Sequence, residues 1–368
     1  MKQSRKYESP LPKRPILSPD LTRPDWTVSG WRDPKKIWLD KNENLDPELA
    51  EITGKILESV VTKTQNLYPD SADLYKKLAS WVGVSPQNLM LTPGSDGVIR
   101  VVFETFISEN DIVLHTVPSF AMYSVYSKMY GVRVVPVEYE RVDEKPLLHS
   151  QKLIDAIQKN KPRLVCLPNP DSPTGTVFTL DNLRLIIKAA AEIGAVILID
   201  EAYHPFCTIT AVPLLSEFPN IIIARTFAKA WGLAGLRIGY SVSSVELTAF
   251  MHKVRPMYEV NTIAVATMEK MLDHYADMQS SVTRLIEGKA YFLNEMTSLG
   301  FNVLHGEGNF LHVQFGSNSE AIHNALSQIV LYRPDFKEKC LSGYSRFSST
   351  TKENFKIIVE AIRKSINK

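Results

Sequence analysis

The chain has 368 residues, which allows two domains or one large domain with a satellite and excludes a single small module. Lys and Arg total 42 against 40 Asp and Glu, so the formal net charge of +2 gives no reason to expect nucleic acid as the main partner. Hydrophobic residues make up 44 % and charged residues 22 %, as in a soluble globular protein with a sizeable core.

No targeting or membrane segment is expected. The longest apolar stretch, residues 194–199, is far shorter than the roughly 20 residues that cross a bilayer. The first fifteen residues are polar and broken by proline, without the apolar region of a secretory signal, so we expect a cytoplasmic protein. Cys166, Cys207 and Cys340 form no CxxC pair and the histidines show no ligand spacing, so we expect neither a disulfide framework nor a metal site.

In chain order, the sequence first predicts an N-terminal arm, residues 1–38, rich in proline and charge, whose Trp26, Trp31 and Trp38 pack against the rest. Helical patterns and short apolar runs then alternate, as in an α/β domain whose buried parallel strands are apolar on both faces. We expect a large domain over residues 39–253 and a smaller α+β domain over residues 254–368. The expected helices are 49–61, 73–82, 96–107, 153–159, 180–192, 262–299 and 352–366, and the expected strands are 112–114, 132–137, 164–167, 195–199, 221–224 and 310–315.

Open α/β sheets bind ligands at the carboxyl ends of their strands, so the residues that directly follow the apolar runs are candidates for a binding site. Asp200 ends the run 195–199, where an acid is costly unless a cationic group meets it. A cap for the next turn is the alternative role. Lys229 follows the run 221–224 among apolar neighbours, which favour the neutral nucleophilic amine that a Schiff base needs, although a surface lysine is the simpler reading of this residue alone.

Two further features could bind an anion. Arg237 lies in a glycine-punctuated loop, where its guanidinium can bind a phosphate in bidentate fashion. Gly94, Ser95 and Asp96 open a predicted helix, whose free N–H groups bind phosphate, although Ser95 or Asp96 could simply be a helix cap. Together, an amine, an acid, an arginine and a helix N-terminus on one sheet edge match the aldehyde, pyridine nitrogen and phosphate of pyridoxal phosphate.

With these residues the chain resembles the fold-type I pyridoxal-phosphate aminotransferases, and within them the histidinol-phosphate aminotransferase family. The resemblance runs from residue 39 almost to the C-terminus, and its most specific part is the block RTFAKAWGLAGLRIGY at residues 225–240. The other markers are LDKNEN at 39–44, YPD at 68–70, GSD at 94–96, PSF at 118–120 with Tyr123, PTG at 173–175, DEAY at 200–203 and NF at 309–310.

The resemblance implies an aspartate-aminotransferase-like fold, a homodimer, and a reaction between a small-molecule amino donor and a keto acceptor, here histidinol phosphate and 2-oxoglutarate. It implies that Lys229 binds the cofactor aldehyde, that Asp200 pairs with the pyridinium nitrogen, and that Tyr203 bonds to the ring hydroxyl. The remaining implied cofactor residues are Phe120 on the ring, Ser95, Asp96, Thr226 and Arg237 around the phosphate, and Tyr68 reaching the phosphate of the neighbouring subunit. The implied substrate residues are Asn44, Arg333 and Arg346.

The chain departs from the family pattern at three places. Ser172 stands where the family has an Asn that contacts the ring hydroxyl, and Ala228 replaces a Ser before the lysine. Ser345 belongs to a segment that is more aliphatic in the family. These departures leave two alternatives open: an aminotransferase for another phosphorylated or sugar-pathway substrate, and a decarboxylase of a phosphorylated amino acid.

Overall fold

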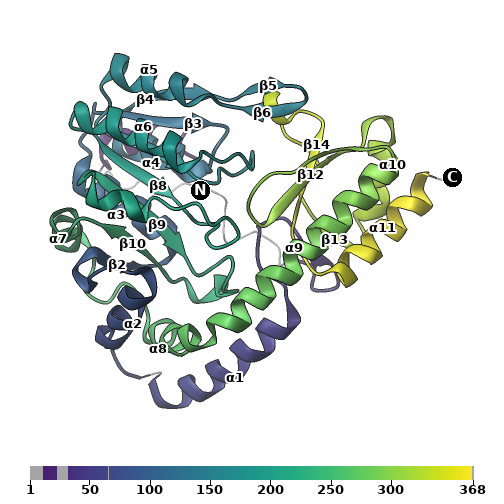
Figure 1. The fold of residues 1–368 in the computed structure, drawn as a ribbon, viewed down its shortest axis with the longest axis horizontal. Coiled ribbons are helices and arrows are strands. Elements are labelled where there is room, and N and C mark those ends of the chain that lie inside the picture. Colours follow the sequence, from purple (N-terminus) through teal and green to yellow (C-terminus); the bar gives the residue numbers. More distant parts are fainter. Residues whose placement is uncertain (1–10, 23–31, 65, 367–368) are drawn as a thin grey trace, which may run out of the picture.

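The computed structural model describes residues 11–22, 32–64 and 66–366, and within them seven strands form the main sheet (Figure 1). Their order is β2–β10–β9–β8–β7–β3–β4, and all neighbours are parallel except β10, which is antiparallel to both β2 and β9. The strands are β2 (Leu89–Thr92), β3 (Ile112–Val117), β4 (Arg133–Glu138), β7 (Leu164–Pro168), β8 (Val196–Asp200), β9 (Ile221–Thr226) and β10 (Gly239–Ser243). This confirms the predicted, mostly parallel sheet.

Side chains of the central strands alternate between two hydrophobic cores, as the period of a strand requires. On β8, Ile197 and Ile199 enter one core, whereas Val196 and Leu198 enter the other. Helices α1, α2, α5, α6 and α8 cover the first face, and α3, α4 and α7 cover the second. The large-domain helices are α1 (Pro47–Thr64), α2 (Ala72–Val82), α3 (Gly94–Phe106), α4 (Ala121–Tyr130), α5 (Ser150–Asn160), α6 (Leu180–Glu192), α7 (Val245–Val254) and α8 (Thr262–Met271).

A smaller unit follows, built on an antiparallel sheet in the order β11–β12–β14. Its strands are β11 (Asn302–Leu304), β12 (Phe310–Gln314) and β14 (Tyr344–Ser348), and its helices are α9 (Tyr275–Ser298), α10 (Ser319–Leu326) and α11 (Lys352–Ile366). The expected single helix over 262–299 is broken into α8 and α9 by a short 3-10 turn, Leu272–His274. Helix α9 runs from beside α8 across to the small sheet, so it connects the two units (Figure 1).

The chain passes from the core of the large sheet to the core of the small sheet within α9, and not at residue 254. Val260 and Met268 pack into the core of the large sheet, whereas Phe292 and Met296 of α9 pack into the core of the small one. Leu39 also belongs to the small core. The limits of the domains themselves stay a prediction, but these contacts show that the chain crosses between the two cores more than once.

The described parts of the N-terminal arm pack on both units. Strand β1 (Ile37–Trp38) pairs in parallel with β13 (Val330–Leu331) of the small unit, and the 3-10 turn Arg14–Leu17 lies against α4. The Trp38 ring contacts the guanidinium of Arg32 at 4.6 Å. Trp26 and Trp31 lie outside the described residues. A two-stranded hairpin, β5 (Glu140–Val142) and β6 (Lys145–Leu147), completes the described strands.

Among the helices that the structure describes, none combines the length and apolarity needed to cross a bilayer. The same residues hold no cluster of three or more His, Cys, Asp or Glu arranged for a metal ion. Cys166, Cys207 and Cys340 are all buried and unpaired.

Candidate active site

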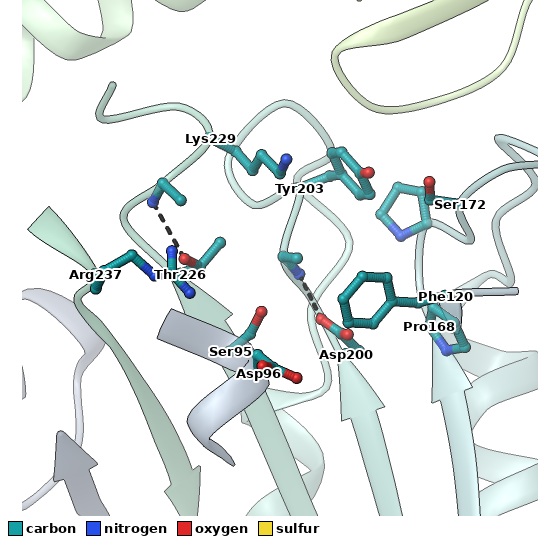
Figure 2. Close-up of a pocket in the computed structure, with 13 residues that line it drawn as sticks. Ser95, Asp96, Phe120, Pro168, Ser172, Asp200, Tyr203, Thr226, Lys229 and Arg237 are labelled. Carbon is teal, nitrogen blue, oxygen red and sulfur yellow. Dashed lines mark hydrogen bonds between the residues drawn. The ribbon is translucent and has the colours of Figure 1, made fainter. Parts of the chain in front are cut away.

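A cavity opens where β7, β8 and β9 end, at the carboxyl edge of the parallel strands (Figure 2). Strand geometry explains the position, because parallel strands deliver the residues that follow them to one edge. The structure thus brings together most of the predicted site residues. The cavity is lined by Ser95, Asp96, Phe120, Pro168, Pro170, Ser172, Asp200, Ala202, Tyr203, Thr226, Ala228, Lys229 and Arg237.

One end of the cavity is suited to an anion. Ser95 and Asp96 lie in the first turn of α3, opposite Thr226 and Arg237 in Figure 2. The Arg237 guanidinium donates to the Pro93 and Ala234 carbonyls, which hold it beside that helix end. Gly94 has φ +77°, and a Cβ there would stand 3.0 Å from Arg237 Nη2. A glycine at this position therefore lets the guanidinium approach the helix N-terminus.

Asp200 is the acid of the site. It ends β8 and is 5 % exposed, and burial raises the pKa of its carboxyl to about 6. Its hydrogen-bond partners in the described part of the chain are neutral: the Tyr123 hydroxyl at 2.8 Å and the Ala202 N–H at 3.0 Å. The adjacent Glu201 instead forms a buried ion pair with Arg225 at 2.9 Å. Of the two neighbouring acids, only Asp200 therefore lines the cavity.

Lys229 supplies the amine. Its Nζ donates to the Lys41 carbonyl at 2.7 Å and points across the cavity toward Tyr203 (Figure 2). Burial, and then the nearby charge of Arg346, lower the pKa of the Lys229 amine to about 8. A substantial fraction of the amine is thus neutral near pH 8, which is the nucleophilic form.

Aromatic and hydroxyl groups line the remaining wall. Phe120 is 40 % exposed and meets Tyr123 edge-on, with ring centroids 6.1 Å apart, so it is linked to the residue that holds Asp200. The Tyr203 phenol is buried, and this burial raises its pKa, while the charge of Arg346 and then the hydroxyl of Ser172 act in the opposite direction. Ser172 and Tyr203 lie on the same side of the cavity in Figure 2.

Asn42 is a site residue that the sequence analysis missed. It is 3 % exposed, and its amide Nδ2 donates to the Tyr203 hydroxyl at 2.8 Å. Asn44, which we expected to bind substrate, instead donates to the Ala230 carbonyl at 2.9 Å and to Ser281 Oγ at 3.0 Å. The two asparagines lie in one motif, and only their side-chain geometry distinguishes them. The role of Asn44 in substrate binding stays a prediction.

Arg333 and Arg346 face each other across an antiparallel bridge, with N–H to carbonyl distances of 3.0 and 2.8 Å. Arg346 is 8 % exposed, donates to the Asp40 carbonyl, and has its pKa lowered by burial. Within the described residues neither arginine has a carboxylate within ion-pair distance. Two like charges held together without a counterion favour an anionic ligand.

Tyr68 lies away from this cavity. Its ring is 78 % exposed and stacks on Tyr258 with centroids 4.4 Å apart. Leu67 and Met257, at 60 % and 77 % exposure, adjoin the stacked pair in sequence. The expected contact of Tyr68 with a neighbouring subunit therefore stays a prediction.

The residues present fit pyridoxal phosphate. Among residues 11–22, 32–64 and 66–366 the desolvated Asp200 carboxyl has only neutral hydrogen-bond partners, and a protonated ring nitrogen would supply the missing positive charge. The end of the cavity at Gly94 and Arg237 can bind a phosphate, and the Lys229 amine can condense with an aldehyde. Asp200 also caps the turn that follows it, through the Ala202 N–H, so this predicted alternative and a place in the cavity hold together, whereas Lys229 lines the cavity.

The family model for aminotransferase class I and II matches residues 34–362. The chain belongs to this family. Among its relatives, the histidinol-phosphate aminotransferase of Thermoanaerobacter pseudethanolicus is 31 % identical over 334 residues, covering 90 % of this chain and 93 % of that protein. The histidinol-phosphate aminotransferase of Sulfurisphaera tokodaii is 29 % identical over 276 residues, covering 75 % of each chain.

Solved structures confirm that this aminotransferase has the predicted fold. The histidinol-phosphate aminotransferase of Sinorhizobium meliloti, in complex with pyridoxal 5'-phosphate, superposes with a TM-score of 0.78 at 23 % identity over 90 % of this chain and 91 % of that one. The L-threonine-O-3-phosphate decarboxylase of Porphyromonas gingivalis gives a TM-score of 0.75 at 18 % identity over 90 % and 100 % of the chains. The fold alone therefore accommodates both of the reaction types considered from the sequence.

Proposed function

We propose that this chain is a pyridoxal-phosphate-dependent aminotransferase that uses histidinol phosphate as amino donor and 2-oxoglutarate as acceptor. The observation that carries the proposal is the position of Lys229, whose amine lies in one cavity with the buried Asp200 carboxyl and the Arg237 anion site. The similarity to histidinol-phosphate aminotransferases over 90 % of the chain supports this substrate.

When bound, pyridoxal phosphate supplies an aldehyde for amine exchange and a ring that accepts electrons from the substrate carbon. Asp200 would keep the ring nitrogen protonated, because the protonated nitrogen stabilises the Asp200 carboxylate in this desolvated position. Lys229 first holds the cofactor. When it is not bound to the cofactor, its Nζ would take a proton from the substrate carbon and deliver it to the cofactor, because an amine with a pKa of about 8 is a suitable base and acid near neutrality.

Arg333 and Arg346 would bind the substrate anion. Their guanidinium groups lack a carboxylate partner among the described residues, and a phosphate or a distal carboxylate can accept bidentate hydrogen bonds from them. One pair of arginines would thus serve the phosphate of the donor and the second carboxylate of the acceptor in alternate halves of the reaction.

The exposed aromatic pair Tyr68 and Tyr258, with Leu67 and Met257, supports a homodimer as part of this proposal. A second copy that covers these side chains would remove exposed apolar surface from water. Sedimentation at micromolar concentration should give twice the 41.5 kDa chain mass, and a single-chain mass would refute this part of the proposal.

Single-turnover spectroscopy with defined donors tests the substrate. The cofactor-loaded protein is mixed with histidinol phosphate, histidinol or L-threonine-O-3-phosphate, and the visible absorbance of the bound cofactor is followed. Rapid bleaching with histidinol phosphate, and recovery with 2-oxoglutarate, is the expected result. Bleaching by an unrelated amine alone would point to another phosphorylated or sugar-pathway substrate, and carbon dioxide release without an acceptor would make the protein a decarboxylase.

A truncated substrate tests the arginine pair. If Arg346 binds the phosphate, R346K should slow the half-reaction of histidinol phosphate by about tenfold or more and affect histidinol much less. R363K is the matched control, because Arg363 lies half-exposed on α11 and pairs with Glu295. Equal losses with both substrates would show that Arg346 does not recognise the phosphate.

A further inference from the structure

Residues 39–42 form a strap that is held by the small unit but touches the large one. On the small-unit side, the Leu39 carbonyl accepts from the Ser348 N–H at 2.9 Å, and the Asp40 carbonyl accepts from Arg346 Nη2 at 2.8 Å. On the large-unit side, the Lys41 carbonyl accepts from Lys229 Nζ. The strap therefore joins the candidate anion-binding arginine to the candidate cofactor lysine.

Asn42 is the last residue of the strap, and four hydrogen bonds hold it. Its N–H donates to Ser348 Oγ at 2.8 Å, and its carbonyl accepts from Asn309 Nδ2 at 2.9 Å. Its side-chain Oδ1 accepts from the Ser348 hydroxyl at 3.3 Å, and its Nδ2 donates to the Tyr203 hydroxyl at 2.8 Å. Asn42 has φ +55°, a left-handed conformation that Asn, Asp and Gly adopt more readily than other residues.

These bonds determine the direction in which the Tyr203 hydroxyl can donate. An amide NH₂ group can only donate, so the phenol oxygen must accept from Asn42. Ser348 Oγ already accepts from the Asn42 N–H and donates its own proton to the amide oxygen, and this pair of bonds favours the orientation in which Nδ2 faces Tyr203. The single proton of the phenol is then left to donate elsewhere, toward the cavity that Tyr203 and Ser172 both line (Figure 2).

We propose that Asn42 is a positioning residue that sets the hydrogen-bond polarity of Tyr203, so that the phenol donates to the ring oxygen of the bound cofactor. This inference rests on the proposed function. A donor at that oxygen stabilises its deprotonated form, so Asn42 acts on the cofactor without touching it. Ser348 and Asn309 belong to the small unit, so residues of both units hold the side chain that orients Tyr203.

The test is a pH titration of the visible absorbance of the cofactor-loaded protein, without any substrate. The variants are N42G, which removes the side chain and keeps the left-handed backbone, and N42D, which replaces the donor with an acceptor of the same shape. Y203F and the double variant N42G/Y203F complete a double-mutant cycle. In the described part of the chain, Arg346 and Asp200 act on Tyr203 through their charges and Lys229 points toward it across the cavity (Figure 2), and all three are unchanged in these variants.

N110G and N110D are the matched controls. Asn110 also has a positive φ, +72°, but it is exposed and precedes β3, at the opposite edge of the sheet from the cavity. The same substitutions there repeat the change in backbone freedom and charge, and they should leave the titration midpoint unchanged. Circular dichroism and thermal unfolding verify that each variant is folded.

We expect N42G to raise the titration midpoint by about 0.5–1 pH unit, and N42D to raise it further, by about 1–2 units. In the Y203F background, N42G should shift the midpoint by less than about 0.2 unit, since the phenol that transmits the effect is gone. Equal shifts in both backgrounds, no shift, or a shift for N42D no larger than that for N42G would overturn the inference. A wild-type protein that acquires no visible absorbance with pyridoxal phosphate would refute the proposed function instead.

Discussion

The buried ion pair of Glu201 and Arg225 lies directly behind the site acid, and its removal should affect stability far more than chemistry. Arg225 is 5 % exposed and Glu201 is 1 % exposed. Glu201 Oε2 accepts from Arg225 Nε at 3.0 Å and from Nη2 at 2.9 Å, and Oε1 accepts from the Ala211 N–H at 2.7 Å. Thr210 also donates to Glu201, so the carboxylate is fully bonded.

The variant E201Q leaves the Arg225 charge buried without a counterion. It also turns one amide N–H group toward an existing donor, the Arg225 guanidinium or the Ala211 N–H. Breaking a buried pair in this way costs about 3–5 kcal/mol of unfolding free energy. The double variant E201M/R225M removes both charges, so its loss should be smaller than the sum of the losses in E201M and R225M by about 2 kcal/mol.

Urea unfolding of the wild type and the four variants, followed by circular dichroism, measures these free energies. The visible absorbance of the cofactor-loaded E201Q should be retained at low urea, because Asp200 and not Glu201 lines the cavity. A loss below about 1 kcal/mol in E201Q, or additive losses in the double variant, would refute the electrostatic reasoning.

The remaining predictions concern two glycines and a histidine. G94A should weaken pyridoxal phosphate binding about tenfold, measured by fluorescence titration, because its Cβ would stand 3.0 Å from Arg237 Nη2 at a positive φ; unchanged affinity would contradict the assigned anion site. G288A should lower the unfolding free energy by about 1–3 kcal/mol, because its Cβ would come 2.0 Å from the Thr350 carbonyl oxygen; full stability in urea would contradict the close packing of α9 on the segment before α11. Burial lowers the pKa of His312 from 6.5 to about 3, so the unfolded chain binds a proton that the folded chain does not as pH falls below 6.5. From pH 7 to pH 5, wild-type protein should therefore lose about 2 kcal/mol more unfolding free energy than H312L, and parallel losses would be the contrary result.

The large sheet was predictable because its strands are apolar on both faces. The runs at 164–167, 195–199 and 221–224 became β7, β8 and β9, and their order along the chain placed Asp200 and Lys229 at one edge. Strands β2 and β10 were not predicted. Ser241 of β10 is fully buried, and its pairing with β9 and β2 decided its structure more than its composition did.

The helical pattern over 262–299 was continuous in sequence, and only packing shows that it is broken. Met268 of α8 and Leu285 of α9 both face the large-sheet core, whereas Phe292 of α9 faces the small one, so the change of core lies within α9 and not at the break. The periodicity of apolar residues shows which face of a helix is buried, but not where a single turn changes to 3-10 geometry. The 3-10 turn Leu272–His274 therefore could not be predicted from the sequence.

Some residues of the candidate site could be predicted from the sequence and others could not. Residues that follow buried strands could be placed from sequence, because the sheet fixes their position to within a residue or two. Asn42 could not, since its role depends on a positive φ and on Ser348, which lies 306 positions away in the chain. Its positive φ had no glycine to mark it, and the neighbouring Asn44 offered an equally good amide.

The most direct test of the central claim is borohydride reduction of the cofactor-loaded protein followed by peptide mass mapping. The proposal predicts a single stable cofactor label, on the peptide that contains Lys229. Lys289 is an internal control, because burial lowers the pKa of its amine to about 8 as well, yet it lies outside the cavity and donates to the carbonyls of Gly306 and Gly308. A label on Lys289 in place of Lys229, or no label under saturating pyridoxal phosphate, would contradict the proposal.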